Sequence, residues 1–228
     1  IIMNYPGKEL ESFDKATVWR FYIYKKIKKY IKKNILEVGA GIGSFTSNYM
    51  HLSKDITLTE IDKTNLVLIK KKFRNTKYFI SNKETKKLKK KYDTIMYLNV
   101  LEHIKKDKKE LEIAVSKLKK NGFLIILVPA HNKLYSKFDK AVGHHKRYDL
   151  EFFKKLKLKE TKLEQLYFLD FMGYFLYYIN KIFFKNETYP SAFKILIWDK
   201  LFTPITIFLD KLFLYKFGKN ILFILKKI

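Results

Sequence analysis

Residues 34–46 constrain the fold of this chain more than any other segment. An apolar run at 35–38 is typical of a strand, and three glycines follow at alternate positions between 39 and 43. Glycine permits a tight turn and lets a ligand approach the backbone closely. A helical pattern begins next, and the free N–H groups at a helix start commonly face a bound ligand. The sequence therefore predicts a strand, a turn and a helix start of the kind found in nucleotide-binding α/β domains.

The side chains around this turn indicate the charge of the ligand. The spacing is G-x-G-x-G, and Ser44 stands where a dinucleotide-binding turn has its last glycine. Glu37 precedes the first glycine, and Glu60 ends the next expected strand, where a carboxylate accepts hydrogen bonds from ribose hydroxyls. A carboxylate at position 37 repels a pyrophosphate but attracts a cation. We therefore predict a site for S-adenosylmethionine, whose amino and sulfonium groups are positive.

The rest of the chain alternates strand and helix patterns. Apolar runs predict strands at 56–60, 77–80, 93–99, 123–128 and 163–168, and a last strand at 221–225. Amphipathic spacings predict helices at 9–33, 45–52, 63–73, 106–118 and 150–158, and Asp62 suits the N-cap of the third. This rhythm is typical of an α/β fold with a doubly wound, Rossmann-like parallel sheet of seven strands.

We expect a single domain over residues 1–228, a length that can bury a good core. Its expected parts are an N-terminal helical cap (1–33), a ligand-binding core (34–169), a helical aromatic insertion (170–217) and the last strand (218–228).

The net charge of +26 would ordinarily suggest a nucleic-acid partner. Only residues 20, 74 and 147 are arginines among the 48 basic residues, and Ile, Phe, Tyr and Asn are abundant, as in proteins from AT-rich genomes. Base readout and bidentate phosphate contacts favour arginine. We therefore expect no nucleic-acid partner, and an anionic surface, including a membrane, is a minor alternative.

Cysteine is absent, which excludes disulfides, thiol nucleophiles and cysteine-based zinc sites. Residues 1–8 lack the apolar region of a signal peptide, and no uninterrupted apolar run reaches the ~18 residues of a membrane span. We expect a cytoplasmic protein, with a peripheral location at the inner face of the membrane as the alternative.

Four segments resemble, in order, the motifs of class I S-adenosylmethionine-dependent methyltransferases: ILEVGAGIG, LTEID, YDTIMYLNVLEHIKKD and LKKNGFLIILVPAH. GKELESF…WRFY, LYSKFDKAVGHHKRYDLEFFKKL and FGKNILFILKK are similar to a bacterial subgroup with a G-H-x-[RK]-R-Y element. Members of that subgroup often accompany glycosyltransferases of surface-polysaccharide or lipid-linked glycan assembly. The resemblance spans nearly the whole chain.

The resemblance implies how the cofactor is held. Glu37 and the loop backbone would hold the methionine part, and Glu60 would hold the ribose. The loop residues implied are Gly39, Ala40, Gly41 and Gly43.

Four further residues are implied around the same ligand. Ile61 would flank the adenine, and Asn82 stands where many members have an acidic residue that contacts the adenine. Asn99, after the fourth strand, would line the methionine pocket and, with Leu101, would border the transferring methyl.

The pair Glu102-His103 resembles the Glu-His pair of ubiquinone-type O-methyltransferases, where an earlier glutamate helps to form a divalent-metal site. Asn99 occupies that earlier place here, and loss of a hard carboxylate ligand weakens a magnesium site. A lone Glu-His pair at a helix start is more often structural. We therefore expect no metal.

Methyl transfer to oxygen or nitrogen is an in-line displacement, and a hydroxyl acceptor must also lose a proton. Histidine suits that task near neutral pH. The candidate histidines are His103, His131, His144 and His145.

The G-H-x-[RK]-R-Y element supplies His144, Arg147 and Tyr148, after the carboxyl end of a strand where α/β sites open. We predict His144 as the general base, with Arg147, Tyr148 and His103 as further catalytic residues. An arginine in so lysine-rich a chain suggests a carboxylate or phosphate partner. The alternative is an insertion loop that Arg147 holds to a structural acid such as Asp139.

The aromatic stretch at 168–184 is interrupted by Asp170, Asn180 and Lys181, so it is too short and too polar to span a bilayer. Three roles stay open. It can be a helical cap on the sheet and on residues 192–215, a surface that lies on lipid headgroups, or a dimer interface. A monomer and a homodimer are both open.

We therefore predict a methyltransferase that uses S-adenosylmethionine to modify an oxygen or nitrogen of a glycan or lipid-linked glycan precursor. The pair Glu102-His103 favours a quinone-like or phenolic small molecule as the nearest alternative acceptor. The charge suggests an RNA methyltransferase, which would bind RNA with a steep salt dependence. A non-catalytic scaffold with this fold is the remaining alternative, and it would bind cofactor weakly or not at all.

Overall fold

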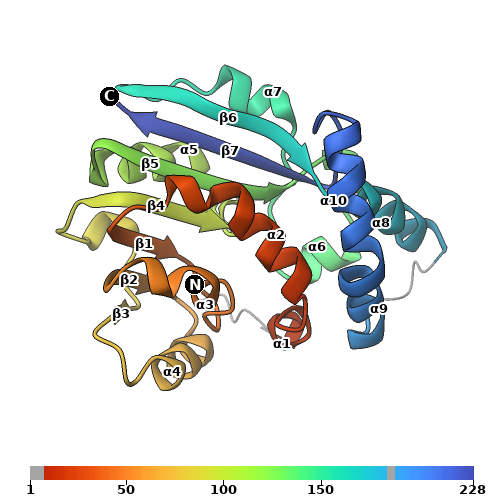
Figure 1. The fold of residues 1–228 in the computed structure, drawn as a ribbon, viewed down its shortest axis with the longest axis horizontal. Coiled ribbons are helices and arrows are strands. Elements are labelled where there is room, and N and C mark those ends of the chain that lie inside the picture. The colour runs from red at the N-terminus through yellow and green to blue at the C-terminus, as the bar shows by residue number, and fades with distance from the viewer. Residues whose placement is uncertain (1–7, 184–187) are drawn as a thin grey trace.

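Seven strands form one sheet in the order β3-β2-β1-β4-β5-β7-β6 (Figure 1). The computed structural model describes residues 8–183 and 188–228, so Phe184 and the segment 1–7 of the signal-peptide argument lie outside it. The strands are β1 (Asn34–Val38), β2 (Asp55–Thr59), β3 (Phe79–Ser81), β4 (Tyr92–Leu98), β5 (Leu118–Pro129), β6 (Thr161–Leu169) and β7 (Asn220–Lys227). The predicted seven-stranded, Rossmann-like α/β fold is confirmed.

Helices cover both faces of the sheet. They are α1 (Lys8–Phe13), α2 (Thr17–Ile27), α3 (Thr46–Tyr49), α4 (Lys63–Lys72), α5 (Asp107–Lys117), α6 (Lys137–Ala141), α7 (Leu150–Lys155), α8 (Phe171–Phe183), α9 (Ala192–Ile197) and α10 (Thr203–Leu212). One core cluster joins α2 and α4 to the sheet, and the other joins α5 and α7 to its opposite face. Figure 1 shows α1, α6, α8 and α9 beyond the carboxyl ends of the central strands, where ligands of such sheets bind.

The single N-terminal helix predicted at 9–33 is wrong, because the chain breaks between α1 and α2. The Arg20 guanidinium donates hydrogen bonds to the carbonyl oxygens of Phe13 at 2.9 Å and Asp14 at 2.6 Å, which pairs carbonyls that a continued helix would use. The break lets α1 reach the glycine turn, where a Cβ atom on Gly41 would lie 3.3 Å from Leu10 Cδ1.

The sheet is mixed rather than parallel throughout. Strand β7 runs antiparallel to both β5 and β6. Leu169, at the end of β6, pairs with Asn220, at the start of β7, so the helical insertion leaves and re-enters the sheet at the same edge. A chain that re-enters a sheet at the same end of the strands where it left must run in the opposite direction. The alternation of strand and helix patterns in the sequence did not reveal this reversal.

The helical insertion also caps the N-terminal part of the chain. Helix α2 begins after Ala16, whose side chain cannot cap it. Asp199 lies in a π-helical turn, Trp198–Phe202, between α9 and α10 and accepts hydrogen bonds from the N–H groups of Val18 at 3.2 Å and Trp19 at 2.8 Å. A carboxylate at this end also complements the helix dipole. The two parts are therefore joined by a buried acid as well as by apolar packing.

Replacing Asp199 with alanine should lower the unfolding free energy by about 1–3 kcal/mol, because two buried N–H groups lose their acceptor. Urea unfolding followed by circular dichroism measures the change. Asp199→Asn keeps an amide oxygen as an acceptor and should lose less than half of that amount. An alanine variant as stable as the parent chain would show that this cap contributes nothing.

Candidate active site

The predicted glycine turn lies between β1 and α3. Gly39, Gly41 and Gly43 have φ values of +65°, +57° and +74°, in the left-handed region that favours glycine. A Cβ atom on Gly43 would lie 2.5 Å from Phe73 Cε2, and one on Gly39 would lie 2.8 Å from Val100 Cγ2. The turn thus needs glycine both for its conformation and for packing against neighbouring side chains.

The N–H groups of this turn are not arranged to hold an anion. The Ala40 N–H donates to the Thr59 carbonyl at 2.9 Å, and the Gly43 N–H donates to the Ala40 carbonyl at 2.9 Å. The Gly41 N–H donates to Glu60 Oε2 at 2.8 Å. These three N–H groups are therefore not free to face a ligand. The turn suits a ligand that needs no anion-binding donors there.

A cavity of about 1390 Å³ opens beside the turn. Glu37 and Glu60 both line it, and they are buried, with exposed fractions of 3% and 7%. Two carboxylates and no free turn N–H at positions 40, 41 and 43 favour a positively charged ligand over a pyrophosphate. The residues present therefore fit the predicted cationic cofactor.

The carboxyl of Glu37 is tied to the first crossover helix. Its Oε2 accepts hydrogen bonds from Thr46 Oγ1 and from the Tyr49 hydroxyl, each at 2.6 Å. Burial raises the pKa of Glu37 to about 7, while these hydrogen bonds act in the opposite direction. The side chain is therefore held at the cavity wall in one position.

The carboxyl of Glu60 is bound to backbone on both sides. It accepts hydrogen bonds from the Gly41 N–H and the Asp62 N–H, each at 2.8 Å. Burial raises the pKa of Glu60. A carboxylate offers about four acceptor positions, so Glu60 retains capacity for a ribose hydroxyl. Asp62 itself caps α4 by accepting from the Asn65 N–H, as predicted.

The other predicted cofactor residues divide into two groups. Ile61, which is 73% exposed, and Asn99, at φ +54°, line the cavity. Asn82 is exposed and lies outside the lining, because β3 is the edge strand and the chain turns away after it. Leu101 is fully buried in the second core cluster and does not reach the cavity. Gly43 is part of the turn but does not line the cavity.

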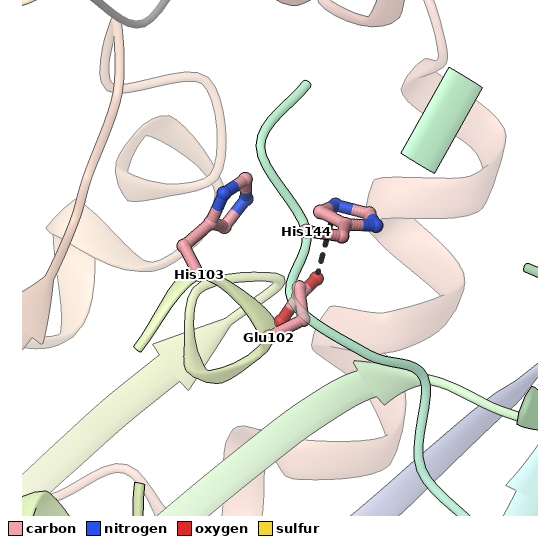
Figure 2. Close-up of side chains that lie close together, drawn as sticks. All are labelled: Glu102, His103 and His144. Atoms are coloured by element: carbon pink, nitrogen blue, oxygen red, sulfur yellow. Dashed lines mark ion pairs between the residues drawn. The ribbon is translucent and has the colours of Figure 1, made fainter. Parts of the chain in front are cut away.

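Glu102, His103 and His144 converge in another part of the same cavity (Figure 2). Glu102 and His103 belong to a short 3-10 turn, Leu101–His103, which points Leu101 into the core and the next two side chains toward the cavity. His144 comes from the loop after α6, with its Nε2 3.8 Å from Glu102 Oε1. The His103 and His144 ring centroids are 4.7 Å apart.

Burial controls the protonation of this cluster. Burial raises the pKa of Glu102 to about 7, and among residues 8–183 and 188–228 neither of its carboxyl oxygens has a hydrogen-bond partner. Burial and the neighbouring His144 lower the pKa of His103 to about 3, so its imidazole is neutral. Sequence reasoning treated the Glu-His pair as structural, because nothing in the sequence indicates that His144 lies against it.

Asp139 holds His144 and Arg147 in place. Its carboxylate accepts from His144 Nδ1 at 2.7 Å, Arg147 Nε at 2.9 Å and the Tyr177 hydroxyl at 2.7 Å. Burial opposes the charge on Asp139, but these partners hold the pKa of its carboxyl well below the usual range. The open alternative for Arg147, an ion pair with Asp139, is the observed arrangement. Tyr177 also stacks 4.2 Å from the guanidinium and was missed, because the aromatic insertion gave no sign of facing a charge.

Tyr148 is buried away from the cavity, so its position does not favour the predicted catalytic role. It is 1% exposed and lies outside the cavity lining. Its hydroxyl donates to Asp107 Oδ2 at 2.9 Å and to the Leu101 carbonyl at 3.1 Å, which supports the turn that carries Glu102. Of the remaining candidate histidines, His131 bonds to the Gly218 carbonyl and His145 is exposed, and neither lines the cavity.

The family described as "Methyltransferase domain" matches residues 19–180, more than two thirds of this chain. The chain belongs to this methyltransferase family. No curated protein matches this chain with statistical significance. Its motifs at the turn, after β2 and after β4 all fall within the matched residues.

Solved structures of other methyltransferases share the fold. A S-adenosylmethionine-dependent methyltransferase from Clostridium acetobutylicum ATCC 824 has a TM-score of 0.63 at 15% identity, covering 96% of this chain and 98% of that one. Coclaurine N-methyltransferase, solved with N-methylheliamine and SAH, has a TM-score of 0.62 at 12% identity, and the match covers 93% of this chain and 72% of that one. The N-methyltransferase NodS from Bradyrhizobium japonicum WM9, solved with S-adenosyl-L-homocysteine, has a TM-score of 0.57 at 10% identity. That match covers 99% of this chain and 90% of that one.

Glu37→Gln tests the charge of the buried carboxyl. Because the pKa is about 7 in the folded chain and ordinarily 4.5, the folded chain keeps a proton that the unfolded chain releases between these values. The unfolding free energy of the parent chain therefore falls as the pH rises through this window. The amide removes this dependence, so the variant should gain roughly 2–3 kcal/mol relative to the parent chain between about pH 4 and pH 8. Urea unfolding at several pH values measures this, and a pH-independent difference would contradict it.

Proposed function

We propose that this chain transfers the methyl group of S-adenosylmethionine to an oxygen or nitrogen of a glycan or lipid-linked glycan precursor. One observation carries the proposal: a single cavity is lined by the glycine turn with Glu37 and Glu60, and also by Glu102, His103 and His144. Two of the similar structures, coclaurine N-methyltransferase and NodS, hold S-adenosylhomocysteine, the product left when this cofactor has lost its methyl group.

The donor part of the cavity suits S-adenosylmethionine. Glu37 would attract the positively charged methionine part, and Glu60 would accept a hydrogen bond from the ribose. Ile61 and Asn99 line the same part and would flank the adenine and the methionine, respectively. The cofactor supplies a methyl group activated by a sulfonium, so the chain itself needs only to align the acceptor and remove its proton.

His144 would remove that proton. Asp139 accepts a hydrogen bond from Nδ1 at 2.7 Å, which assigns the ring hydrogen to that nitrogen and leaves Nε2 as the acceptor. Arg147 lines the cavity, is 2% exposed and donates a hydrogen bond to Asp139, so it would position His144. His103 lies against His144 and narrows the space around Nε2.

A lipid-borne acceptor is supported by the exposed face of the helical insertion. On α8 the exposed apolar side chains are Phe175, Ile179, Ile182 and Phe183, and on α10 and the turn before it they are Leu201, Ile205, Phe208 and Leu212. Both sets recur at helical spacing, and lysines such as Lys181 and Lys211 lie on the same helices. Among the described helices, none is long and apolar enough to cross a membrane. We place the chain in the cytoplasm, at the inner membrane face.

Calorimetry with S-adenosylhomocysteine tests the core of the proposal. The parent chain and His144→Gln should both bind it, with Kd values that agree within about threefold, because His144 does not hold the donor. Transfer of labelled methyl from S-adenosylmethionine to a membrane-lipid extract should fall by about 10²- to 10⁴-fold in His144→Gln.

His51→Gln is the matched control, since its exposed ring lies outside the cavity, and it should keep full activity. Absence of S-adenosylhomocysteine binding by the parent chain would overturn the methyltransferase proposal. Methyl incorporation into an RNA extract or a phenol, but not into the lipid extract, would overturn the acceptor assignment alone.

Sedimentation with vesicles tests the membrane location. Vesicles that contain phosphatidylglycerol should sediment the chain, and phosphatidylcholine vesicles should do so less, because the chain carries a net charge of +26. The double variant Phe208→Ser, Leu212→Ser should bind anionic vesicles about tenfold more weakly, since two exposed apolar side chains no longer enter the interface. Val67→Ser on α4, which is 65% exposed in the parent chain, is the matched apolar control. Equal binding by all three proteins would contradict the proposed face.

A further inference from the structure

The carboxyl of Glu102 has no explanation among its protein neighbours. Its side chain is fully buried, and neither oxygen has a hydrogen-bond partner in the described part of the chain. An unpaired buried carboxyl costs several kcal/mol unless a proton or a cation neutralises it. His144 Nε2 lies 3.8 Å from Glu102 Oε1, which is too far for a hydrogen bond. The carboxyl therefore faces a gap between potential ligand atoms.

Both histidines beside this gap are held by other parts of the chain. His144 Nδ1 is 2.7 Å from Asp139 Oδ1, and His103 hydrogen-bonds to the backbone of Gly143. Metal-binding histidines are usually held as His144 is, with one ring N–H donated to a carboxylate or carbonyl and the other nitrogen directed at the ion. Figure 2 shows the His144 ring next to the Glu102 carboxyl and the His103 ring farther from it.

We propose that Glu102, His103 and His144 bind a divalent transition-metal ion. Each residue offers one ligand atom, and these atoms lie within 4.8 Å of one another. Small side-chain rotations would bring all three to the ~2.0–2.2 Å distances of imidazole and carboxylate ligands. Two imidazoles and one carboxylate suit Zn²⁺, Mn²⁺, Fe²⁺ or Co²⁺, and they do not suit Ca²⁺ or Mg²⁺, which prefer oxygen ligands.

This site differs from the one that the sequence excludes. The sequence predicts no metal because Asn99 replaces a carboxylate ligand near Glu102. In the structure the third ligand comes instead from His144, and Asp139, buried on α6, orients it. Three protein ligands leave further coordination positions open, and the cavity that all three residues line gives an acceptor access to them.

The ion would add a function to the acceptor part of the cavity. This consequence, unlike metal binding itself, rests on the proposed methyl transfer. An acceptor hydroxyl that binds the ion loses its proton to solvent water more readily, because the metal lowers its pKa. Nε2 of His144 is then a metal ligand and no longer a base. The acceptor's proton goes to solvent water instead of to His144. A hydroxyl with a second oxygen next to it, as in a sugar diol, suits two adjacent open positions.

Cobalt binding tests the site directly, with a readout independent of turnover. The full chain, stripped with a chelator and titrated with CoCl₂, should bind one ion per chain and develop the visible absorption bands of Co²⁺ held by nitrogen and oxygen ligands. Zn²⁺ should displace it. His144→Gln and Glu102→Gln should each weaken Co²⁺ binding by about tenfold or more, and Asp139→Asn by about 10- to 100-fold.

His131→Gln is the matched control, since its ring lies outside the cluster and bonds to the Gly218 carbonyl, and it should bind Co²⁺ like the parent chain. S-adenosylhomocysteine calorimetry on each variant shows that it is folded. A parent chain that binds S-adenosylhomocysteine but no Co²⁺ would overturn this inference and leave the methyltransferase proposal intact, as would equal Co²⁺ affinity in Glu102→Gln and His144→Gln. If the parent chain binds Co²⁺ but not S-adenosylhomocysteine, the methyltransferase proposal is overturned and the metal site stands.

Discussion

The acceptor side of this molecule depends on the interactions of one buried carboxylate, Asp139. Besides His144 and Arg147, it accepts hydrogen bonds from the Ser136 N–H at 2.9 Å and from Tyr177 on α8. A buried charge is tolerated only when it is paired and fully hydrogen-bonded. The loop that carries His144 and the insertion that carries Tyr177 are therefore fixed by the same requirement, and movement of either one would remove hydrogen-bond partners from the carboxylate.

Acidic and basic residues both line the cavity. The chain carries a net charge of +26, and the buried acids Glu37, Glu60 and Glu102 line the cavity together with basic residues such as Lys137 and Arg147. Surface lysines are screened by solvent and salt, whereas buried carboxylates act on a ligand with little screening. The net charge thus says little about what enters the cavity. The three acids, together with a turn whose N–H groups bond internally, describe its ligand better.

The sequence predicted what local chemistry determines. The glycines of the turn, Glu60 at the end of β2 and the Asp62 cap all depend on residues within one strand and the helix after it. Contacts between segments far apart in the chain could not be predicted from the sequence. The cap that Asp199 places on α2 joins residues 180 positions apart, and the placing of His144 against Glu102 depends on a loop whose path the sequence does not define.

Differences between the predicted site and the cavity lining have the same origin. Tyr148 adjoins Arg147 in the motif, but successive residues of an extended segment point in opposite directions, so Tyr148 enters the core while Arg147 reaches Asp139. Leu101 and Glu102 diverge in the same way within one tight turn. Membership in a motif indicated the region of the site, and backbone geometry decided which members face the cavity.

The position of β7 has a consequence for how the sheet forms. β7 lies between β5 and β6 and pairs with both along nearly its whole length, although it follows both in the chain. During synthesis β5 and β6 each have an unpaired edge until residues 220–227 emerge, because in the described part of the chain β7 is the strand that lies between them. Open strand edges promote pairing with other chains. The growing chain is therefore most prone to aggregation just before its sheet is completed.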